Sequence, residues 1–183
     1  MKKIRTPARK AGVRVSATRQ IDAGFPPILG PKPRFLILGS LPSQASLAAA
    51  QYYAHPRNAF WPMLGAIIGF DATLPYAARV EKLKETHIAV WDVCAAAHRP
   101  GSLDSDIAPD TVTPNDFAAL FARNPTIEAV LLNGGTAADL FKSRVLPALS
   151  ACPDRHRLPS TSPAHAGMSF DDKRARWAAA LGR

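Results

Sequence analysis

The chain has 183 residues, of which 47% are hydrophobic and 20% charged, and its mean hydropathy is −0.06. This length suits one compact domain, and the composition supports a buried core, which excludes a disordered or collagen-like chain. The longest apolar runs fall far short of the roughly 20 residues that cross a bilayer, so we expect no transmembrane segment.

Positive charge concentrates at the N-terminal end of the chain. Residues 1–34 hold nine Lys and Arg and one acid, Asp22, whereas the rest holds 14 basic and 13 acidic residues. We therefore expect a basic, Pro-rich arm, residues 1–32, ahead of a nearly neutral domain, residues 33–183. Such an arm suits contacts with nucleic-acid phosphates, although a solvated tail explains the charge equally well. No apolar stretch follows the basic start, so we expect no secretory signal.

Cysteines and histidines show no metal-binding pattern. Cys94 and Cys152 permit at most one disulfide and form no CxxC pair, and we expect both to be reduced in the core of a cytoplasmic protein. The five histidines lack a spacing such as HExxH. We expect neither a metal ion nor another cofactor.

Predicted strands and helices alternate along the chain. Apolar runs bounded by Gly and Pro predict buried strands, and amphipathic spacing predicts helices. Thr113 and Pro114 are typical of a helix start, with Thr113 as its cap. The alternation predicts an α/β fold, namely a single three-layer α/β/α domain with a central four-stranded, mainly parallel sheet. The expected strands are 35–38, 88–92, 127–132 and 155–158, and the expected helices are 44–51, 58–68, 76–85, 114–123, 134–149 and 170–181.

Four polar segments follow the expected strands, at 39–43, 92–94, 133–135 and 158–163. Because ligands bind at the carboxyl ends of parallel strands, these segments should line one pocket. The first segment is neither a P-loop nor a GxSxG nucleophile elbow. The Asn-Gly-Gly sequence at 133–135 is either a tight turn or a place where a phosphate approaches the backbone.

Aromatic and basic side chains gather between residues 51 and 61. Phe60 and Trp61 fit the core side of a helix, whereas Tyr52 and Tyr53 lie in an expected loop beside basic side chains. Aromatic faces next to cationic groups are suited to stacking bases and contacting phosphates.

Three motifs, in this order, resemble those of the uracil-DNA glycosylase superfamily: GSLPSQAS at 39–46, QYYAHPRNAFWP at 51–62 and LPSTSPA at 158–164. The chain is most similar to the hypoxanthine (deoxyinosine) DNA glycosylase branch, often called family six, over about residues 25–182, and segments 91–94 and 101–104 also look like that branch. The resemblance implies the superfamily's fold and a monofunctional DNA repair glycosylase. Such an enzyme flips a deaminated base, hypoxanthine and/or uracil, out of DNA and hydrolyses its N-glycosidic bond, which leaves an abasic site.

The first motif departs from the superfamily pattern at its third position. Many members have a water-activating Asp or Asn there, whereas this chain has Leu41, which cannot activate water. In the similar branch the asparagine of the second motif takes this task, so the resemblance assigns catalysis to Asn58. Asn58 also suits a helix cap, and the two roles are compatible. Relatives with iron–sulfur clusters use four cysteines, so no cluster is implied.

The resemblance also implies how a base is bound. The flipped base would lie on Tyr53, Asp92 would accept its N–H, and backbone amides near Leu41 would hold a carbonyl oxygen. Asp92 equally suits a helix-dipole partner or an acid at the edge of the core. Ser160, Thr161 and Ser162 could build only a turn, but three hydroxyl groups between two prolines favour phosphate contacts. The expected site is therefore catalytic Asn58; base-binding Gly39, Ser40, Leu41, Tyr53 and Asp92; and DNA-binding Ser43, Ser160, Thr161, Ser162 and His165, with His165 or Pro163 and Ala164 filling the gap in the DNA stack.

Other functions remain open at this stage. A uracil or mismatch glycosylase would present the same motifs, and the basic arm together with Leu41 also fits a non-catalytic nucleic-acid-binding protein on a glycosylase-like fold. A generic nucleotide-binding enzyme has only the analogy of the fold and the Asn-Gly-Gly sequence at 133–135 in its favour. In the favoured interpretation the protein is a monomer that acts on DNA in the cytoplasm, in association with the nucleoid.

Overall fold

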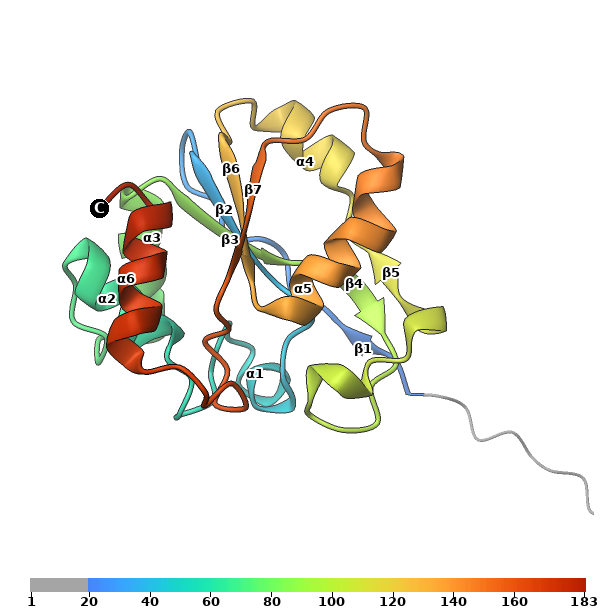
Figure 1. The fold of residues 1–183 in the computed structure, drawn as a ribbon, viewed down its shortest axis with the longest axis horizontal. Helices are drawn as coiled ribbons and strands as arrows, with labels where there is room; N and C mark the ends of the chain where they lie inside the picture. Colours follow the sequence, from blue (N-terminus) through green and yellow to red (C-terminus); the bar gives the residue numbers. More distant parts are fainter. Residues whose placement is uncertain (1–19) are drawn as a thin grey trace, which may run out of the picture.

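The computed structural model describes residues 20–183, and a four-stranded parallel sheet lies at its centre (Figure 1). The strand order is β3-β2-β6-β7. Parallel pairing of all neighbours confirms the predicted sheet, and it brings the carboxyl ends of the four strands to one edge. The strands are β2 (Phe35–Gly39), β3 (Ile88–Asp92), β6 (Ala129–Asn133) and β7 (Asp154–Leu158).

Helices cover both faces of this sheet, as the three-layer prediction requires (Figure 1). Ile37 points into a core shared with α2 (Phe60–Ile68), α3 (Tyr76–Glu85) and α6 (Phe170–Ala180). Leu36 and Leu38 point the other way, toward α4 (Phe117–Arg123) and α5 (Gly135–Leu140). This alternation follows from the period-two geometry of a strand. Each large side chain fully buried in these cores contributes about 1.5–3 kcal/mol.

A second, antiparallel sheet was not predicted. Its order is β1-β4-β5, formed by β1 (Asp22–Ala23), β4 (Cys94–Ala97) and β5 (Thr113–Pro114). Ile28 also pairs with Val90 of the main sheet. Residues 20–32, which the sequence analysis placed in the arm, therefore pack against the domain. This packing was not predicted, because the pairing partners lie far along the chain. Residues 1–19 of the expected arm lie outside the described residues.

Five of the six expected helices differ from the structure in their bounds; α1 and α6 end two residues and one residue earlier than predicted, and the other three begin later than predicted. Thr113 belongs to β5, where it pairs with Ala96 of β4, and it does not cap a helix. Asp116 caps α4 instead, since its carboxylate accepts a hydrogen bond from the Ala119 N–H at 2.9 Å. Asn58 precedes α2, which begins at Phe60. The helix expected at 134–149 is α5 followed by a π turn (Phe141–Val145) and a 3₁₀ turn (Leu146–Ala148), where Pro147 lacks the N–H that an α-helix needs. The remaining helix, α1, spans Gln44–Ala49.

Both cysteines are free, with Cys94 buried and Cys152 half-buried. None of the helices in the described part of the chain is long and apolar enough to cross a membrane. Within the same residues, no three His, Cys, Asp or Glu side chains gather as potential metal ligands.

Candidate active site

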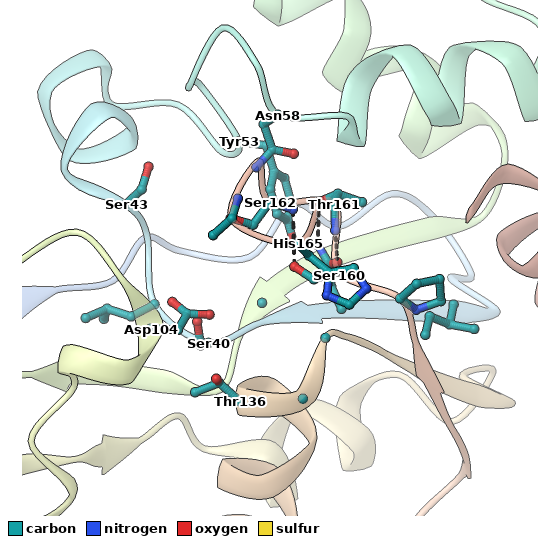
Figure 2. Close-up of a pocket in the computed structure, with 18 of the residues that line it drawn as sticks. Ser40, Ser43, Tyr53, Asn58, Asp104, Thr136, Ser160, Thr161, Ser162 and His165 are labelled. Atoms are coloured by element: carbon teal, nitrogen blue, oxygen red, sulfur yellow. Dashed lines mark hydrogen bonds between the residues drawn. The ribbon is translucent and has the colours of Figure 1, made fainter. Parts of the chain in front are cut away.

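A cavity of about 930 Å³ opens at the carboxyl ends of the four parallel strands (Figure 2). All four predicted segments contribute to its wall. The residues expected to act in catalysis, base binding and DNA binding all line the cavity, so the fold brings the three motifs together. These residues are Gly39, Ser40, Leu41, Ser43, Tyr53, Asn58, Asp92, Ser160, Thr161, Ser162 and His165. Pro163, an alternative for filling the DNA stack, does not line the cavity.

Asn58 lies at the upper wall of the cavity, just before α2 (Figure 2). Its Oδ1 accepts from the Phe60 N–H at 3.0 Å, so the side chain helps to start the helix. The next residue, Ala59, donates its N–H to the carbonyl of Thr161 at 3.0 Å, which ties this turn to the third motif. The Nδ2 group and the second lone pair of Oδ1 remain for a ligand.

Tyr53 presents its ring to the same cavity from a strained backbone position. Its φ is 55°, in the left-handed region, and its ring stacks on Phe60 with the centroids 3.7 Å apart. The hydroxyl is buried and has no hydrogen-bond partner among residues 20–183; it lies close to Gly39, where a Cβ would be 3.2 Å from it. Burial, reinforced by Asp92, raises the pKa of Tyr53, so the phenol is neutral at physiological pH.

Asp92 forms part of the floor of the cavity, at the end of β3. It is only 3% exposed, and its Oδ2 has no hydrogen-bond partner among the described residues. Gly39 makes room for this carboxyl group, because a Cβ there would lie 2.3 Å from Oδ1. Burial raises the pKa of Asp92 to about 8, repulsion from Asp104 adds to the rise, and Arg99 opposes it. At neutral pH the group is therefore mainly a carboxylic acid, which donates as well as accepts a hydrogen bond.

Asp104 is a cavity residue that the sequence analysis did not select, although it ends the similar segment 101–104. It lies in the loop after β4 and faces Ser40 (Figure 2). Burial raises its pKa, while a hydrogen bond from Ser40 and the charge of Arg99 lower it. The presence of an acid in a segment that looks like the hypoxanthine branch could have identified Asp104 as a site residue. Two carboxyl groups thus line the deep part of the cavity.

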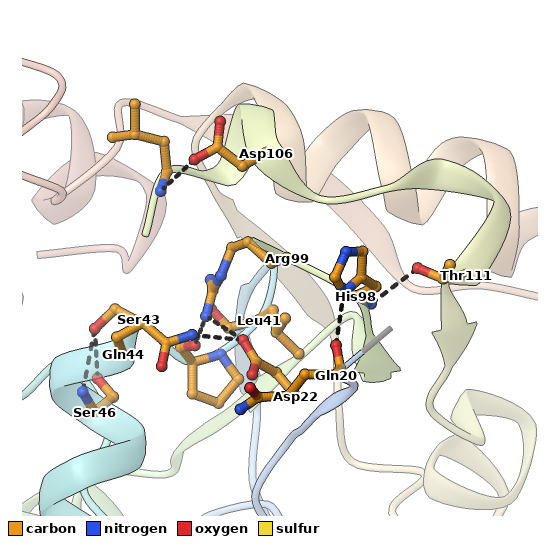
Figure 3. A network of polar contacts seen from close by, with 12 residues as sticks. Gln20, Asp22, Leu41, Ser43, Gln44, Ser46, His98, Arg99, Asp106 and Thr111 are labelled. Atoms are coloured by element: carbon orange, nitrogen blue, oxygen red, sulfur yellow. Dashed lines mark hydrogen bonds and ion pairs between the residues drawn. The ribbon is translucent and has the colours of Figure 1, made fainter. Parts of the chain in front are cut away.

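The segment 39–43 is held from behind by a buried ion pair (Figure 3). Arg99 donates to the backbone carbonyls of Leu41 and Pro42 and pairs with Asp22 at 3.2 Å. The Asp22 carboxylate also accepts from Gln44 at 2.8 Å. Breaking a buried pair of this kind by removing one partner costs about 3–5 kcal/mol. Sequence reasoning missed Arg99 because its partners lie 57 to 77 residues away.

The Leu41 side chain is 5% exposed and packs in an apolar cluster with Cys94, Ala97 and Ile107. Because the side chain is apolar and packed in this cluster, only the backbone of Leu41 can form hydrogen bonds at the cavity. The position that carries an acid or amide in many superfamily members therefore contributes packing here, and its carbonyl is engaged by Arg99.

Within the third motif, Thr161 is an internal residue. It is 1% exposed, and its hydroxyl and N–H both pair with the Asn133 side chain at 2.9 Å. Contacts with DNA are therefore expected from the neighbouring Ser160 and Ser162 and not from Thr161, which corrects the expectation for this residue. The hydroxyl oxygens of Ser160 and Ser162 accept backbone N–H groups, so their protons remain available to a phosphate oxygen.

The residues 133–135 form a tight turn. Gly134 has a φ of 101°, and a Cβ there would lie 2.9 Å from the Cβ of Ser160. Its N–H donates to the carbonyl of Leu158 at 3.0 Å. Glycine at this position therefore lets β6 and the third motif approach each other, which accounts for it without a phosphate.

Ser43 and His165 lie nearer the mouth. Ser43 caps α1, since its hydroxyl oxygen accepts from the Ser46 N–H at 3.2 Å. His165 is exposed, and Lys173 of α6 donates to its carbonyl at 2.6 Å, which anchors the loop while the imidazole stays accessible.

The chain is similar to DNA glycosylases over most of its length. A hypoxanthine DNA glycosylase from Methanosarcina barkeri is 35% identical over 161 residues, covering 87% of this chain and 98% of the relative. One from Methanosarcina acetivorans is 36% identical over 139 residues, covering 71% and 87%. The NMR structure of a candidate uracil DNA glycosylase from the latter organism superposes with a TM-score of 0.75 at 34% identity, covering 88% and 97%. The family model described as the uracil DNA glycosylase superfamily matches residues 26–181, and the chain belongs to this superfamily.

Proposed function

We propose that the protein is a monofunctional DNA glycosylase that releases a deaminated base, hypoxanthine and/or uracil, and leaves an abasic site. The observation that carries this proposal is the single cavity that joins Asn58, Tyr53 and Asp92 to the hydroxyl groups of the third motif. The names of the two Methanosarcina relatives favour hypoxanthine. One cavity therefore holds side chains suited to bind the base, to position water at the sugar and to contact phosphates.

The base is proposed to enter the cavity after it rotates out of the DNA stack. Rotation costs a few kcal/mol and favours weakly paired bases. Stacking on Tyr53 returns about 1–3 kcal/mol but does not distinguish bases. Asp92, as a carboxylic acid, matches the N–H and the adjacent C=O that hypoxanthine and uracil share, because it accepts from one and donates to the other.

Asn58 is proposed to position the attacking water. The hydrogen bond from the Phe60 N–H fixes Oδ1, so the side chain is oriented before substrate arrives. Its remaining lone pair would accept from a water that faces the anomeric carbon as the glycosidic bond breaks with oxocarbenium character. The reaction ends at the abasic site without strand cleavage.

Incubation with duplexes that contain one inosine, uracil, xanthine or thymine mismatch tests this function. Strand breaks are expected on the inosine duplex, the uracil duplex or both, and only after alkaline treatment of the products. Breaks before alkali would contradict a monofunctional enzyme. Binding without base release from any duplex would instead support the non-catalytic alternative, which the buried Leu41 motivates.

The two adjacent tyrosines should differ in function. Replacing Tyr53 with Ala removes the stacking surface and is expected to weaken productive binding of the flipped base by about 5- to 150-fold, whereas Tyr53→Phe preserves it. Tyr52 is 4% exposed and its hydroxyl donates to the carbonyl of Phe25, so Tyr52→Ala should mainly lower stability, by about 3 kcal/mol. Single-turnover kinetics over a range of enzyme concentrations, together with thermal unfolding, separate these outcomes. Equal, small kinetic effects would contradict the assignment.

Deletion of residues 1–19 tests the basic arm. The segment carries seven Lys and Arg and no acid, and its removal leaves the Asp22–Arg99 pair intact. If the arm contacts phosphates, each lost contact should reduce the slope of log K against log salt by about 0.9. Base release at saturating enzyme should be unchanged. Identical slopes for the full-length and truncated proteins would identify the arm as a solvated tail.

A further inference from the structure

Two arginines at the cavity have no assigned role. Arg157 in β7 and Arg176 in α6 both line the cavity and are exposed. No other Lys or Arg of residues 20–183 lines it. Neither guanidinium forms an ion pair within the described part of the chain, whereas Arg34, Lys82, Lys84, Arg99 and Arg174 all pair with acids. These two positive charges are therefore available to an anion.

The two arginines lie on opposite sides of the third motif. Arg157 lies against Gly135 at the start of α5, because a Cβ on Gly135 would lie 2.7 Å from its Nη2. Arg176 belongs to α6, which packs on the other face of the sheet. Both elements flank the loop that follows β7 (Figure 1). The loop carrying Ser160 and Ser162 thus lies between α5, against which Arg157 lies, and α6, which carries Arg176.

The charge distribution of the cavity favours phosphate at this place. The deep wall carries Asp92 and Asp104 and, among residues 20–183, no Lys or Arg side chain, so it offers no positive charge to an anion. Near the third motif, the Ser160 and Ser162 hydroxyl groups have protons left to donate. Guanidinium groups bind phosphate oxygens in a bidentate manner, and hydroxyl donors complete such a site. This arrangement suits a nucleotide whose base lies in the deep part of the cavity, beside the two acids, while its phosphates lie near the third motif, beside the two arginines.

We propose that Arg157 and Arg176 bind the phosphates of the strand that carries the flipped nucleotide, one on each side of the third-motif loop. The proposal rests on the proposed function in one respect, that a nucleotide of DNA enters this cavity. It places part of the grip on DNA in the nearly neutral folded domain, in addition to any contribution from the arm.

The chain offers matched controls for a test. Arg155 is exposed on the same strand as Arg157 but does not line the cavity, and Arg174 on α6 pairs with Asp171. The probe is a duplex with one tetrahydrofuran residue, a stable analogue of the abasic product. Its Kd is measured between about 50 and 200 mM salt for Arg157→Ala, Arg176→Ala, the double variant, Arg155→Ala and Arg174→Ala.

Each cavity arginine is expected to contribute one phosphate contact. Arg157→Ala and Arg176→Ala should each weaken binding about tenfold and lower the salt slope by about 0.9, with the two slope changes adding in the double variant. Arg155→Ala and Arg174→Ala should leave the slope unchanged. Slopes that are the same in all four single variants would overturn the proposal.

Base release measured on the same proteins distinguishes the two claims. The double variant should need more enzyme than wild type to reach half of its maximal single-turnover rate, because it has lost two phosphate contacts. If wild-type protein releases no base from any duplex but the slopes fall as expected, the phosphate site stands and the glycosylase proposal fails. If base is released and the slopes do not fall, the phosphate site is wrong and the glycosylase proposal stands.

Discussion

Replacing Asn58 with Ala is expected to slow single-turnover base release by about 100-fold or more, because the side chain is proposed to hold the attacking water and a misplaced reactant costs at least that much. Binding to a duplex with an abasic-site analogue should change little, since Asn58 contacts neither phosphate site. The rate is measured on an inosine duplex with enzyme in excess, so that product release does not contribute.

A second variant separates catalysis from the turn before α2, where Ala59 holds the N-cap position. Asn58→Ala also removes the acceptor for the Phe60 N–H, which costs about 1 kcal/mol of stability. Asn58→Ser retains a side-chain oxygen for this bond but lacks the amide. Both variants should be slow, while only the Ala variant should lose the energy of this bond in thermal unfolding. A Ser variant with the wild-type rate would mean that Asn58 only holds the turn.

The second large effect is expected at Asp92. Asp92→Ala should slow base release by about 10- to 100-fold at neutral pH, because the base would lose the donor and acceptor that distinguish it. Asp92→Asn should retain much of the rate, since an amide also donates and accepts. Wild-type base release should fall as the pH rises through about 8, where the acid loses its proton, and the Asn variant should show no fall there. An equal fall in both proteins would exclude Asp92 as its cause.

The groups that face Asp92 limit what else can titrate in this range. Asp104 and Arg99 act on its charge, and the Tyr53 hydroxyl and the Cys94 thiol lie close to it. Burial raises the pKa of Tyr53 and of Cys94, which moves both groups away from this range. Burial also raises the pKa of Asp104, so an Asp104→Asn variant is the control that isolates Asp92.

Ionisation of Asp92 also affects stability, and the number of protons bound by the folded and unfolded states decides whether stability rises or falls with pH. In the unfolded chain Asp92 titrates near 3.8, whereas in the folded protein it titrates at about 8. Between these values the folded state binds more protons, so the free energy of unfolding falls as the pH rises through this window and is constant above it. Urea unfolding at about pH 5 and pH 9 should show a smaller loss for Asp92→Asn than for wild type. Parallel losses would contradict a neutral Asp92.

Local patterns were sufficient to predict most elements of the fold. The strand 88–92 and the helix 76–85 were predicted with the bounds that the structure shows, because each is an uninterrupted pattern with clear ends. The antiparallel sheet was missed, since β1 and β5 have two residues each and depend on partners far along the chain. Thr113 was misassigned because two good caps lie three residues apart, and pairing with Ala96 decides between them.

The residues that line the cavity were predictable, whereas the protonation and the hydrogen bonds of these residues were not. Motif order and strand ends were enough to gather the expected catalytic, base-binding and DNA-binding residues in one cavity. The neutral form of Asp92 depends on burial and on Asp104, which comes from another loop. The internal role of Thr161 depends on Asn133, 28 residues away. Such properties arise from tertiary packing, which the linear spacing of residues does not contain.

The central claim is that this cavity hydrolyses the bond between a deaminated base and its sugar. The most direct measurement follows free base by chromatography and alkali-labile sites by gel, in the same single-turnover reaction on an inosine or uracil duplex, with wild-type protein and with Asn58→Ser. The account predicts that free base and alkali-labile sites appear in equal amounts and at equal rates with wild type, and at least about 100-fold more slowly with the variant. Wild-type protein that binds both duplexes and releases no base would contradict it.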